Sequence, residues 1–318
     1  MPDQLTYDVL IIGGSYAGLS AALVLGRSLR RVLVLDAGQP ANRQTFHAHG
    51  FLTRDGETPA QLTAIALKEV SRYPGVSFCP DTALTAEQVV GGFEVTTAGG
   101  LTVRGRKLLL ATGLADIMPD LRGFAECWGR SVLHCPYCHG YEVHGQPLGL
   151  FGNGDAGYEL ASLIRNWTDR LTLFTNGPAT LTDDQGQMLA DLGVSVVETP
   201  VVSIDHEAGM LTALRLADGH EARPTAVFAR VPFRQSSDLP QQLGCMLTDQ
   251  GLIEATEFGE TSVAGVFAAG DSSTLMRQLA VAVAAGAKAG AWINRALVAE
   301  GCYADNALSV ASLRLPDL

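Results

Sequence analysis

Two cysteines stand three residues apart in the string HCPYCHG, a spacing that suits a reactive pair. We predict that Cys135 caps a helix and that Pro136 takes its first position, where the missing N–H of proline costs nothing. Cys138 then lies one turn further on the same face, within reach of the Cys135 sulfur. The positive end of the helix favours thiolate over thiol, as a redox-active dithiol requires.

Three other readings of the pair remain open at this point. A structural zinc site needs four ligands, and Cys127, His134, His139 and His144 could contribute to one. The string also satisfies the C-x-x-C-H pattern of c-type haem attachment, a chemistry of exported proteins. The pair could also be inert core, since free cysteine is often buried. The rest of the sequence favours the redox dithiol.

Composition indicates a well-buried globular protein, with 47% hydrophobic and 17% charged residues in 318, enough for two domains. The net charge of −11 disfavours nucleic acid and anionic membrane as partners. The apolar run 279–293 contains Lys288 and predicts a buried helix rather than a membrane span. The first strand begins at Tyr7, so we expect no signal peptide and a cytoplasmic protein. The other cysteines, Cys79, Cys127, Cys245 and Cys302, are expected to be small hydrophobic residues.

A dinucleotide-binding βαβ unit begins the chain. Residues 7–12 predict a strand, GGSYAG a glycine turn before a helix, and RVLVLD a second strand that ends at Asp36. Gly13 permits the tight turn, Gly18 allows close helix–strand packing, and Asp36 is placed to bind a ribose. Ser15 replaces the usual second glycine, which narrows the approach to a pyrophosphate, although its hydroxyl could donate to one. A βαβ unit without a ligand is the alternative.

A second glycine turn follows in the middle of the chain. Gly152, Gly154 and Gly157 have the full G-x-G-x-x-G spacing. The next strand, LTLF, runs into TNG at 175–177, which offers neither an acid for NAD nor arginines for NADP. We therefore interpret the three glycines as a vestigial nucleotide site and regard NADP(H) as a doubtful cofactor.

The remaining segments have simpler patterns. Residues 39–56 are polar and irregular, and we predict a loop over a cofactor, with a solvated surface loop as the alternative. Helices are expected at 58–72 and at about 276–299, and strands are expected to end at Gly113 and at Asp271.

The sequence resembles low-molecular-weight thioredoxin reductases and their flavin-dependent relatives over essentially its whole length. The matching strings are GGSYAG, LLLATG, HCPYCHG, GNGDAGYE and GVFAAGD followed by Arg277-Gln278. The resemblance implies an α/β fold with two Rossmann-like, three-layer ββα dinucleotide-binding domains, the second inserted in the first. It implies an FAD-binding domain at 1–117 and 247–318, an NAD(P)-binding-like domain at 118–246 that carries the CxxC, and a homodimer.

The resemblance also assigns roles to residues. Cys135 would exchange with substrate, and Cys138 would face the flavin. His139 replaces the usual aspartate and is a better base near neutral pH, with His134 as a second candidate. The predicted FAD-binding residues are Gly13, Ser15, Tyr16, Ala17, Gly18, Asp36, Asn42, His49, Ala111, Thr112, Gly113, Gly270, Asp271, Arg277, Gln278 and Leu279. No metal ligand is predicted.

Two departures from thioredoxin reductases decide the predicted activity. The first is His139. The second is the loss of the His-Arg-Arg string that holds the 2′-phosphate of NADPH in those enzymes. Each arginine contact to a phosphate is typically worth roughly 1.5–3 kcal/mol. Both point to the flavin-dependent dithiol oxidases. We predict that FAD and O2 oxidise a dithiol substrate, on a small molecule or a thioredoxin-like protein. The alternatives are an NADPH- or ferredoxin-dependent disulfide reductase and a non-enzymatic redox sensor.

Overall fold

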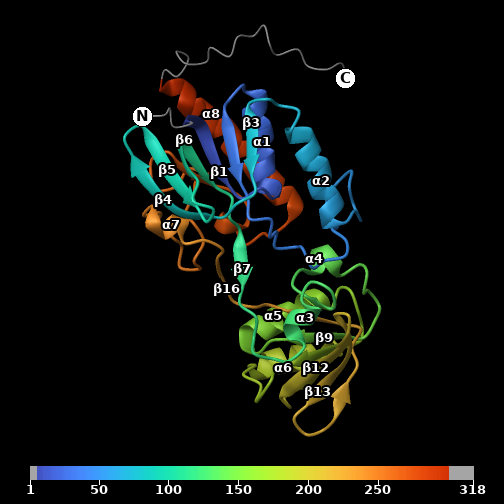
Figure 1. Ribbon diagram of the computed structural model, residues 1–318. Helices are drawn as coiled ribbons and strands as arrows, with labels where there is room; N and C mark the ends of the chain where they lie inside the picture. Colours follow the sequence, from blue (N-terminus) through green and yellow to red (C-terminus); the bar gives the residue numbers. More distant parts are fainter. Residues whose placement is uncertain (1–5, 301–318) are drawn as a thin grey trace. The chain divides into compact units, whose positions relative to one another are not determined.

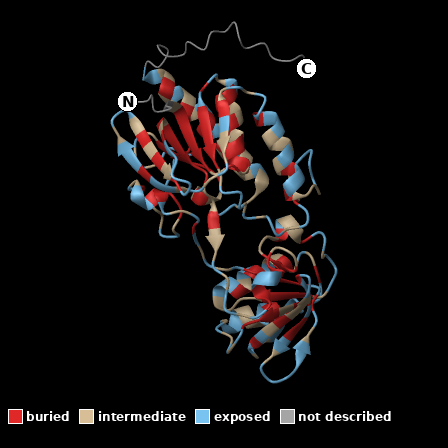
Figure 2. Cartoon of the chain, viewed as in Figure 1, coloured by how far each residue is buried: buried red, intermediate tan, exposed pale blue. Residues whose placement is uncertain are grey.

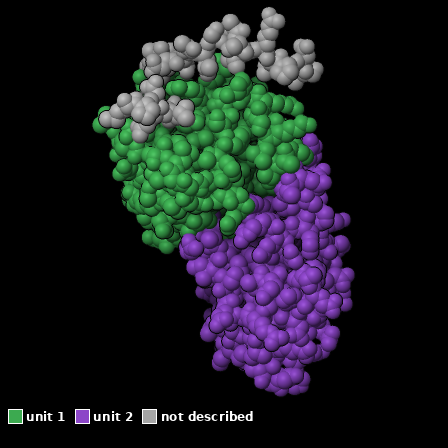
Figure 3. All heavy atoms as spheres, viewed as in Figure 1, with its two compact units in different colours: residues 1–39, 63–113, 235–318 green, residues 40–62, 114–234 purple. Residues whose placement is uncertain are grey.

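The computed structural model describes residues 6–300 and forms two compact units (Figures 1 and 3). Unit 1 comprises residues 1–39, 63–113 and 235–318, and unit 2 comprises residues 40–62 and 114–234. The chain passes between the units after residues 113 and 234, and the polar segment 40–62 groups with unit 2. The last part of the predicted FAD-binding domain, with Cys302, lies outside the described residues.

Unit 1 is built on one seven-stranded sheet. Its strands are β1 (Thr6–Ile12), β2 (Val32–Leu35), β3 (Val76–Cys79), β4 (Ala83–Val89), β5 (Gly92–Thr97), β6 (Thr102–Leu110) and β17 (Val266–Ala268). The order is β3-β2-β1-β6-β5-β4, and β17 also pairs with β6. Strands β3, β2, β1, β6 and β17 are parallel, whereas β4 and β5 form an antiparallel meander. Strands β2 and β17 are continuous buried apolar runs, as is typical of parallel strands whose sheet is covered on both faces (Figure 2).

The helices of unit 1 are mostly those that the sequence predicts. They are α1 (Tyr16–Arg27), α2 (Pro59–Val70, which crosses the unit boundary), α7 (Leu239–Gln242), the 3-10 turn η1 (Asp271–Ser273) and α8 (Leu279–Ala299). Helices α1 and α8 touch through their backbones, since a Cβ at Gly286 would lie 2.0 Å from the Ala17 carbonyl oxygen. Among the described residues, no helix is long and apolar enough to cross a membrane.

Unit 2 contains a second parallel sheet in the order β11-β10-β9-β15-β8 and a three-stranded antiparallel sheet, β12-β13-β14. The strands are β8 (Val132–Leu133), β9 (Leu148–Phe151), β10 (Leu171–Phe174), β11 (Ser195–Val197), β12 (Val201–Glu207), β13 (Met210–Leu216), β14 (Glu221–Ala222) and β15 (Ala226–Ala229). The helices are α3 (Phe124–Cys127), α4 (Pro136–His139), α5 (Gly154–Ile164) and α6 (Asp183–Asp191). Strands β7 (Leu114–Asp116) and β16 (Phe233–Gln235) pair where the chain passes between units. The predicted α/β fold with two nucleotide-binding sheets is confirmed.

Candidate active site

The cysteine pair lies at the start of α4 in unit 2. Cys135 is the N-cap residue with extended backbone, Pro136 occupies the first helical position, and Gly140 ends the helix. The two cysteines form a disulfide with their Cα atoms 5.3 Å apart. The predicted cap, proline position and sulfur pairing are therefore confirmed. Two sulfurs joined to each other are not available as a zinc pair, so the redox reading of the motif is the one that the structure supports.

The helix dipole at the cysteine pair is smaller than the sequence predicts. Helix α4 spans only four residues, a single turn. Because a helix dipole is the sum of aligned peptide units, one turn provides only a small positive end for a thiolate. The N–H groups of Cys138 and His139 both donate to the Cys135 carbonyl oxygen at 3.2 Å and so hold the turn itself.

Trp167 holds the far end of this turn in place. A Cβ at Gly140 would lie 2.7 Å from the Trp167 ring nitrogen, so only glycine fits there. The same indole meets the Tyr137 ring edge-on, with the ring centroids 5.7 Å apart. Tyr137 itself is 65% exposed and Tyr141 is 76% exposed. Exposed aromatic side chains thus flank the disulfide, and the packing of Trp167 against Gly140 holds the turn in place.

His139, the predicted base, is half-buried directly after Cys138. Burial is the main cause that lowers the pKa of His139 below its ordinary value. The Glu142 carboxylate opposes that effect by raising the pKa of His139, and the His49 imidazole lowers the pKa further. The imidazole is therefore neutral at neutral pH and able to accept a proton from a thiol. His134, the second predicted base, lies beside Trp128 with ring centroids 6.3 Å apart.

The first glycine turn of unit 1 is as tight as the sequence predicts. Gly13 has φ +105°, and a Cβ there would lie 2.2 Å from the Ala111 carbonyl oxygen. A Cβ at Gly18 would lie 1.9 Å from the Gly13 carbonyl oxygen. The carboxyl ends of β1, β2 and β6 meet here, since Gly13 N donates to Leu35 O at 2.8 Å and Ala111 N donates to Ile12 O at 2.8 Å. Asp36, at the end of β2, accepts a hydrogen bond from Gly14 N at 2.9 Å.

This turn fits a bound dinucleotide by two further observations. Ser15 caps α1 without a capping bond from its side chain, and the first turn of α1 holds no acidic residue. Thr112 follows β6, and its buried hydroxyl oxygen finds no hydrogen-bond partner among the residues that the structure describes. Amides at a helix N-terminus and an unused buried hydroxyl suit the phosphates and polar groups of FAD.

The predicted flavin residues after β17 gather against the same helix. A Cβ at Gly270 would lie 2.9 Å from the Ala17 Cβ, and Gly270 has φ +80°. Asp271 and Arg277 form an ion pair at 3.5 Å. Gln278 is the N-cap of α8, with Leu279 as its first residue. Gly270 thus meets Ala17, and Asp271 pairs with Arg277, within unit 1; the role of these residues in flavin binding stays a prediction.

Asn42 and His49, two predicted flavin residues, belong to segment 40–62, which groups with unit 2. Their role at a flavin stays a prediction. His49 Nε2 lies 3.4 Å from Glu142 Oε1, and His49 Nδ1 lies 3.6 Å from Asp55 Oδ2. His49 therefore contacts the segment that follows the cysteine pair. Glu142 is not among the predicted site residues, although an acid three residues after His139 on a helical turn is a spacing that places two side chains together.

The second glycine turn is closed by its own side chains. Gly152 and Gly157 approach so closely that a Cβ at either would lie 2.9 Å from the backbone of the other. Asn153 caps α5, with its Oδ1 accepting from Gly154 N at 2.9 Å and from Thr180 N at 2.8 Å. Gly152 and Gly157 thus provide the close packing that the motif requires. The Asn153 side-chain oxygen accepts the hydrogen bond of the first N–H group of α5, that of Gly154.

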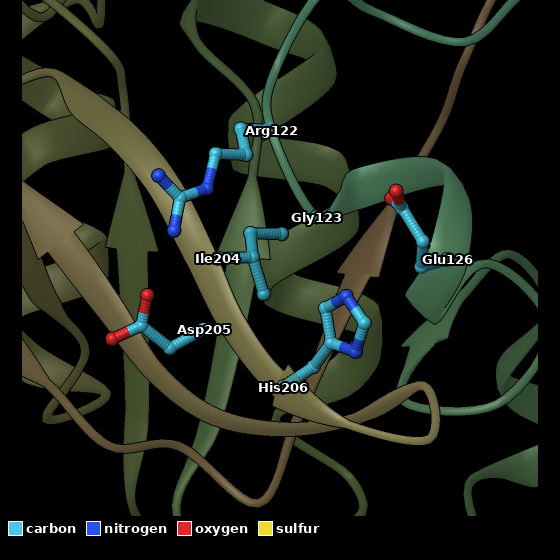
Figure 4. A pocket seen from close by; sticks show the side chains of 6 residues that line it. All are labelled: Arg122, Gly123, Glu126, Ile204, Asp205 and His206. Carbon is cyan, nitrogen blue, oxygen red and sulfur yellow. The ribbon is translucent and has the colours of Figure 1, made fainter.

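Unit 2 also contains a pocket between the segment before α3 and strand β12, with a volume of about 300 Å³ (Figure 4). It is lined by Arg122, Gly123, Glu126, Ile204, Asp205 and His206. The lining carries charges of both signs, and Asp205 is already paired with Arg215 at 2.6 Å. None of the predicted site residues contributes to it, and we assign it no role.

Comparisons with known proteins agree with this site. The family model described as pyridine nucleotide-disulphide oxidoreductase matches residues 7–286. Thioredoxin reductase sirT of Leptosphaeria maculans is 34% identical over 306 residues, covering 91% of this chain and 93% of that protein. An oxidoreductase structure from Agrobacterium tumefaciens matches with TM-score 0.87 and 36% identity, covering 92% and 99% of the two chains. The structure of HlmI matches with TM-score 0.87 and 37% identity over 93% of each chain. The chain therefore belongs to the pyridine nucleotide-disulphide oxidoreductase family, as a thioredoxin reductase-like flavin-dependent disulfide oxidoreductase.

Proposed function

We propose that this protein is an FAD-dependent dithiol oxidase that uses O2 as the electron acceptor. The observation that carries the proposal is the turn after β10, where a nicotinamide domain specific for NADPH would present arginines. Residues 175–180 read TNGPAT and contain no basic residue. Glu198 instead places a carboxylate there, accepting from Ala179 N at 2.7 Å. A carboxylate at this place repels a 2′-phosphate.

The backbone of the same turn supports this interpretation. Asn176 has φ +54° and Gly177 has φ +134°, a region that asparagine and glycine enter far more readily than arginine. The Asn176 side chain also accepts a hydrogen bond from Val201 N at 2.9 Å. Thr175 Oγ1 donates to the Gly177 carbonyl oxygen at 2.7 Å. The Thr175 and Asn176 side chains thus make hydrogen bonds to the protein backbone.

The proposed reaction begins with thiol–disulfide exchange. His139 takes the proton of a substrate thiol, and the thiolate sulfur bonds to the Cys135 sulfur while the Cys135–Cys138 bond breaks. The electron pair of that bond goes to Cys138. The second substrate thiolate then attacks the mixed disulfide, so that the substrate leaves as a disulfide and the enzyme holds a dithiol. When bound, FAD would accept two electrons from the Cys135–Cys138 dithiol, which becomes a disulfide again. O2 would then be reduced to hydrogen peroxide.

The test compares electron donors on the flavin-loaded protein. With a small dithiol in air, we expect uptake of one O2 and formation of one hydrogen peroxide for each disulfide formed. Cys138→Ser should abolish turnover, whereas Cys79→Ala, which removes a partly buried thiol of β3, should leave it intact. Oxygen uptake no greater than that of free FAD would overturn the proposal.

The alternative function is an NADPH-dependent disulfide reductase, which the intact glycine packing of Gly152 and Gly157 favours. It predicts that micromolar NADPH bleaches the flavin rapidly without oxygen. A ferredoxin-fed reductase predicts the same bleaching by reduced ferredoxin instead. The oxidase predicts anaerobic bleaching by dithiol alone, so one series of anaerobic titrations separates the three.

A further inference from the structure

A carboxylate pairs with an imidazole close in sequence to the redox disulfide. Glu142 follows α4, and its Oε1 lies 3.4 Å from His49 Nε2. The other nitrogen of His49 lies 3.6 Å from Asp55, whose side chain is 67% exposed. Glu142 stands three residues after His139, and its charge raises the pKa of His139 while burial lowers it. Asp55, His49 and Glu142 thus form a series of close polar contacts that leads from the surface to the turn of the base beside Cys138.

The segment that carries His49 is held in a defined shape. The Gly56 N–H and Ala48 carbonyl oxygen bond at 2.9 Å, and the Ala48 N–H reaches the Glu57 carbonyl oxygen at 2.9 Å. Asp55 also accepts from Gly50 N at 2.7 Å. His49 is only 22% exposed in its side chain, although the segment around it is polar. These bonds fix the imidazole against Glu142 rather than leaving it as a solvated side chain.

We propose that Glu142 and His49 are positioning residues for His139, which together set its protonation during thiol–disulfide exchange at Cys135–Cys138. The inference rests on the proposed role of His139 as the base, whichever acceptor takes the electrons. The two residues act in opposite directions. The Glu142 charge raises the pKa of His139, and His49 lowers it.

Glu142 and His49 are the two charged groups that shift the pKa of His139, and neighbouring residues make other contacts. Cys135 and Cys138 form the disulfide and do not titrate in that state. Trp167 packs against the end of α4 and has no charge. His144 stacks on Tyr141, with centroids 5.0 Å apart. Asp55 pairs with His49.

The test measures the pH dependence of disulfide reduction in the flavin-loaded protein, by stopped flow with a small dithiol. Glu142→Gln should move the acid limb to lower pH and raise the rate on that limb about threefold or more, because the charge that stabilises the imidazolium is gone. His49→Asn should move the acid limb to higher pH and lower the rate there by a similar factor. A merely structural role would not produce shifts of opposite sign.

A matched control pair exists in unit 2. His220 and Asp218 pair at 3.3 Å on the exposed turn between β13 and β14. Asp218→Asn and His220→Asn make the same charge changes and should leave the profile unchanged. Unshifted profiles for both Glu142→Gln and His49→Asn, or shifts in the same direction, would overturn the inference.

A second measurement keeps the inference separate from the proposed activity. The chain has seven histidines, so ring-labelled histidine gives few NMR signals, and His139→Asn identifies the one for His139. Its titration in the oxidised holoprotein should move in the same opposite directions in the two variants. Absence of dithiol turnover would refute the oxidase, whereas an unmoved His139 titration would refute the positioning role.

Discussion

The contact between α1 and α8 yields the sharpest prediction, because it is made by backbone atoms. An added Cβ at Gly286 would lie 2.0 Å from the Ala17 carbonyl oxygen and 2.8 Å from its carbon. Ordinary contact begins at 3.4 Å, so α8 would have to retreat by about 1.4 Å. No side chain can rotate away to relieve this clash.

The expected cost of Gly286→Ala follows from two opposing effects. Overpacking of this kind costs about 1–3 kcal/mol and occasionally more. Alanine is favoured over glycine inside a helix by about 1 kcal/mol. The 2.0 Å clash is with backbone, so we take the upper end of that range, about 3 kcal/mol, and expect a net loss of about 2 kcal/mol. This loss lowers the Tm of a unit of this size by roughly 4–8 °C. Because Ala17 lies in the first turn of α1, the variant should also lose flavin.

Gly186→Ala is the matched control. Gly186 lies within α6, and a Cβ there would meet nothing within 4 Å. The same substitution should therefore stabilise unit 2 by up to about 1 kcal/mol and leave flavin binding unchanged. Differential scanning calorimetry and flavin absorbance after desalting measure both effects. A Gly286→Ala protein with wild-type Tm and full flavin content would refute the reasoning from backbone contact.

Three further predictions address single buried groups. Ser131→Ala should cost about 1–3 kcal/mol of unfolding free energy in urea titrations, because Ser131 Oγ donates to Gly209 O at 2.8 Å and accepts from Leu211 N at 2.9 Å in a buried site. Thr112→Val should raise the Kd for FAD about fivefold in flavin fluorescence titrations while stabilising the apoprotein, since the hydroxyl has no described partner; unchanged FAD affinity would contradict its role. Burial lowers the pKa of His139 in the folded state, so the folded protein binds this proton less tightly than the unfolded chain. Its contribution to stability is therefore present above about pH 6.5 and lost as the pH falls below that value; His139→Asn should flatten this part of a pH–stability curve.

Local features of the site were predictable from sequence because local chemistry determines them. The proline after Cys135 fixes the first helical position, and the i, i+3 spacing brings Cys138 beside it. The glycine turn at Gly13 and Gly18 follows equally from the absence of room for a Cβ. For the cysteine turn and for Gly18 the deciding residues lie within a few positions in the chain, whereas the room at Gly13 is limited by the Ala111 carbonyl oxygen.

The surroundings of the base were not predictable in the same way. Segment 40–62 follows β2 of unit 1 in sequence and is predicted as a cofactor loop, but nothing in its polar composition indicates that it groups with unit 2. His49 meets Glu142 across 93 residues of sequence, and neither residue has a local pattern that names the other. Pairing over such a distance depends on tertiary packing, which periodicity and turn residues do not encode.

The long apolar helix at the end of the described chain links packing to the predicted cofactor site. Its small residues meet a steric demand from α1. Gly286 meets Ala17, and Ser20 Oγ donates to the Val283 carbonyl oxygen at 2.7 Å. Ser15 makes no side-chain cap, so these contacts, and not a capping bond, position the start of α1. The choice of glycine in α8 thus bears on the predicted phosphate-binding turn more than 260 residues earlier in the sequence.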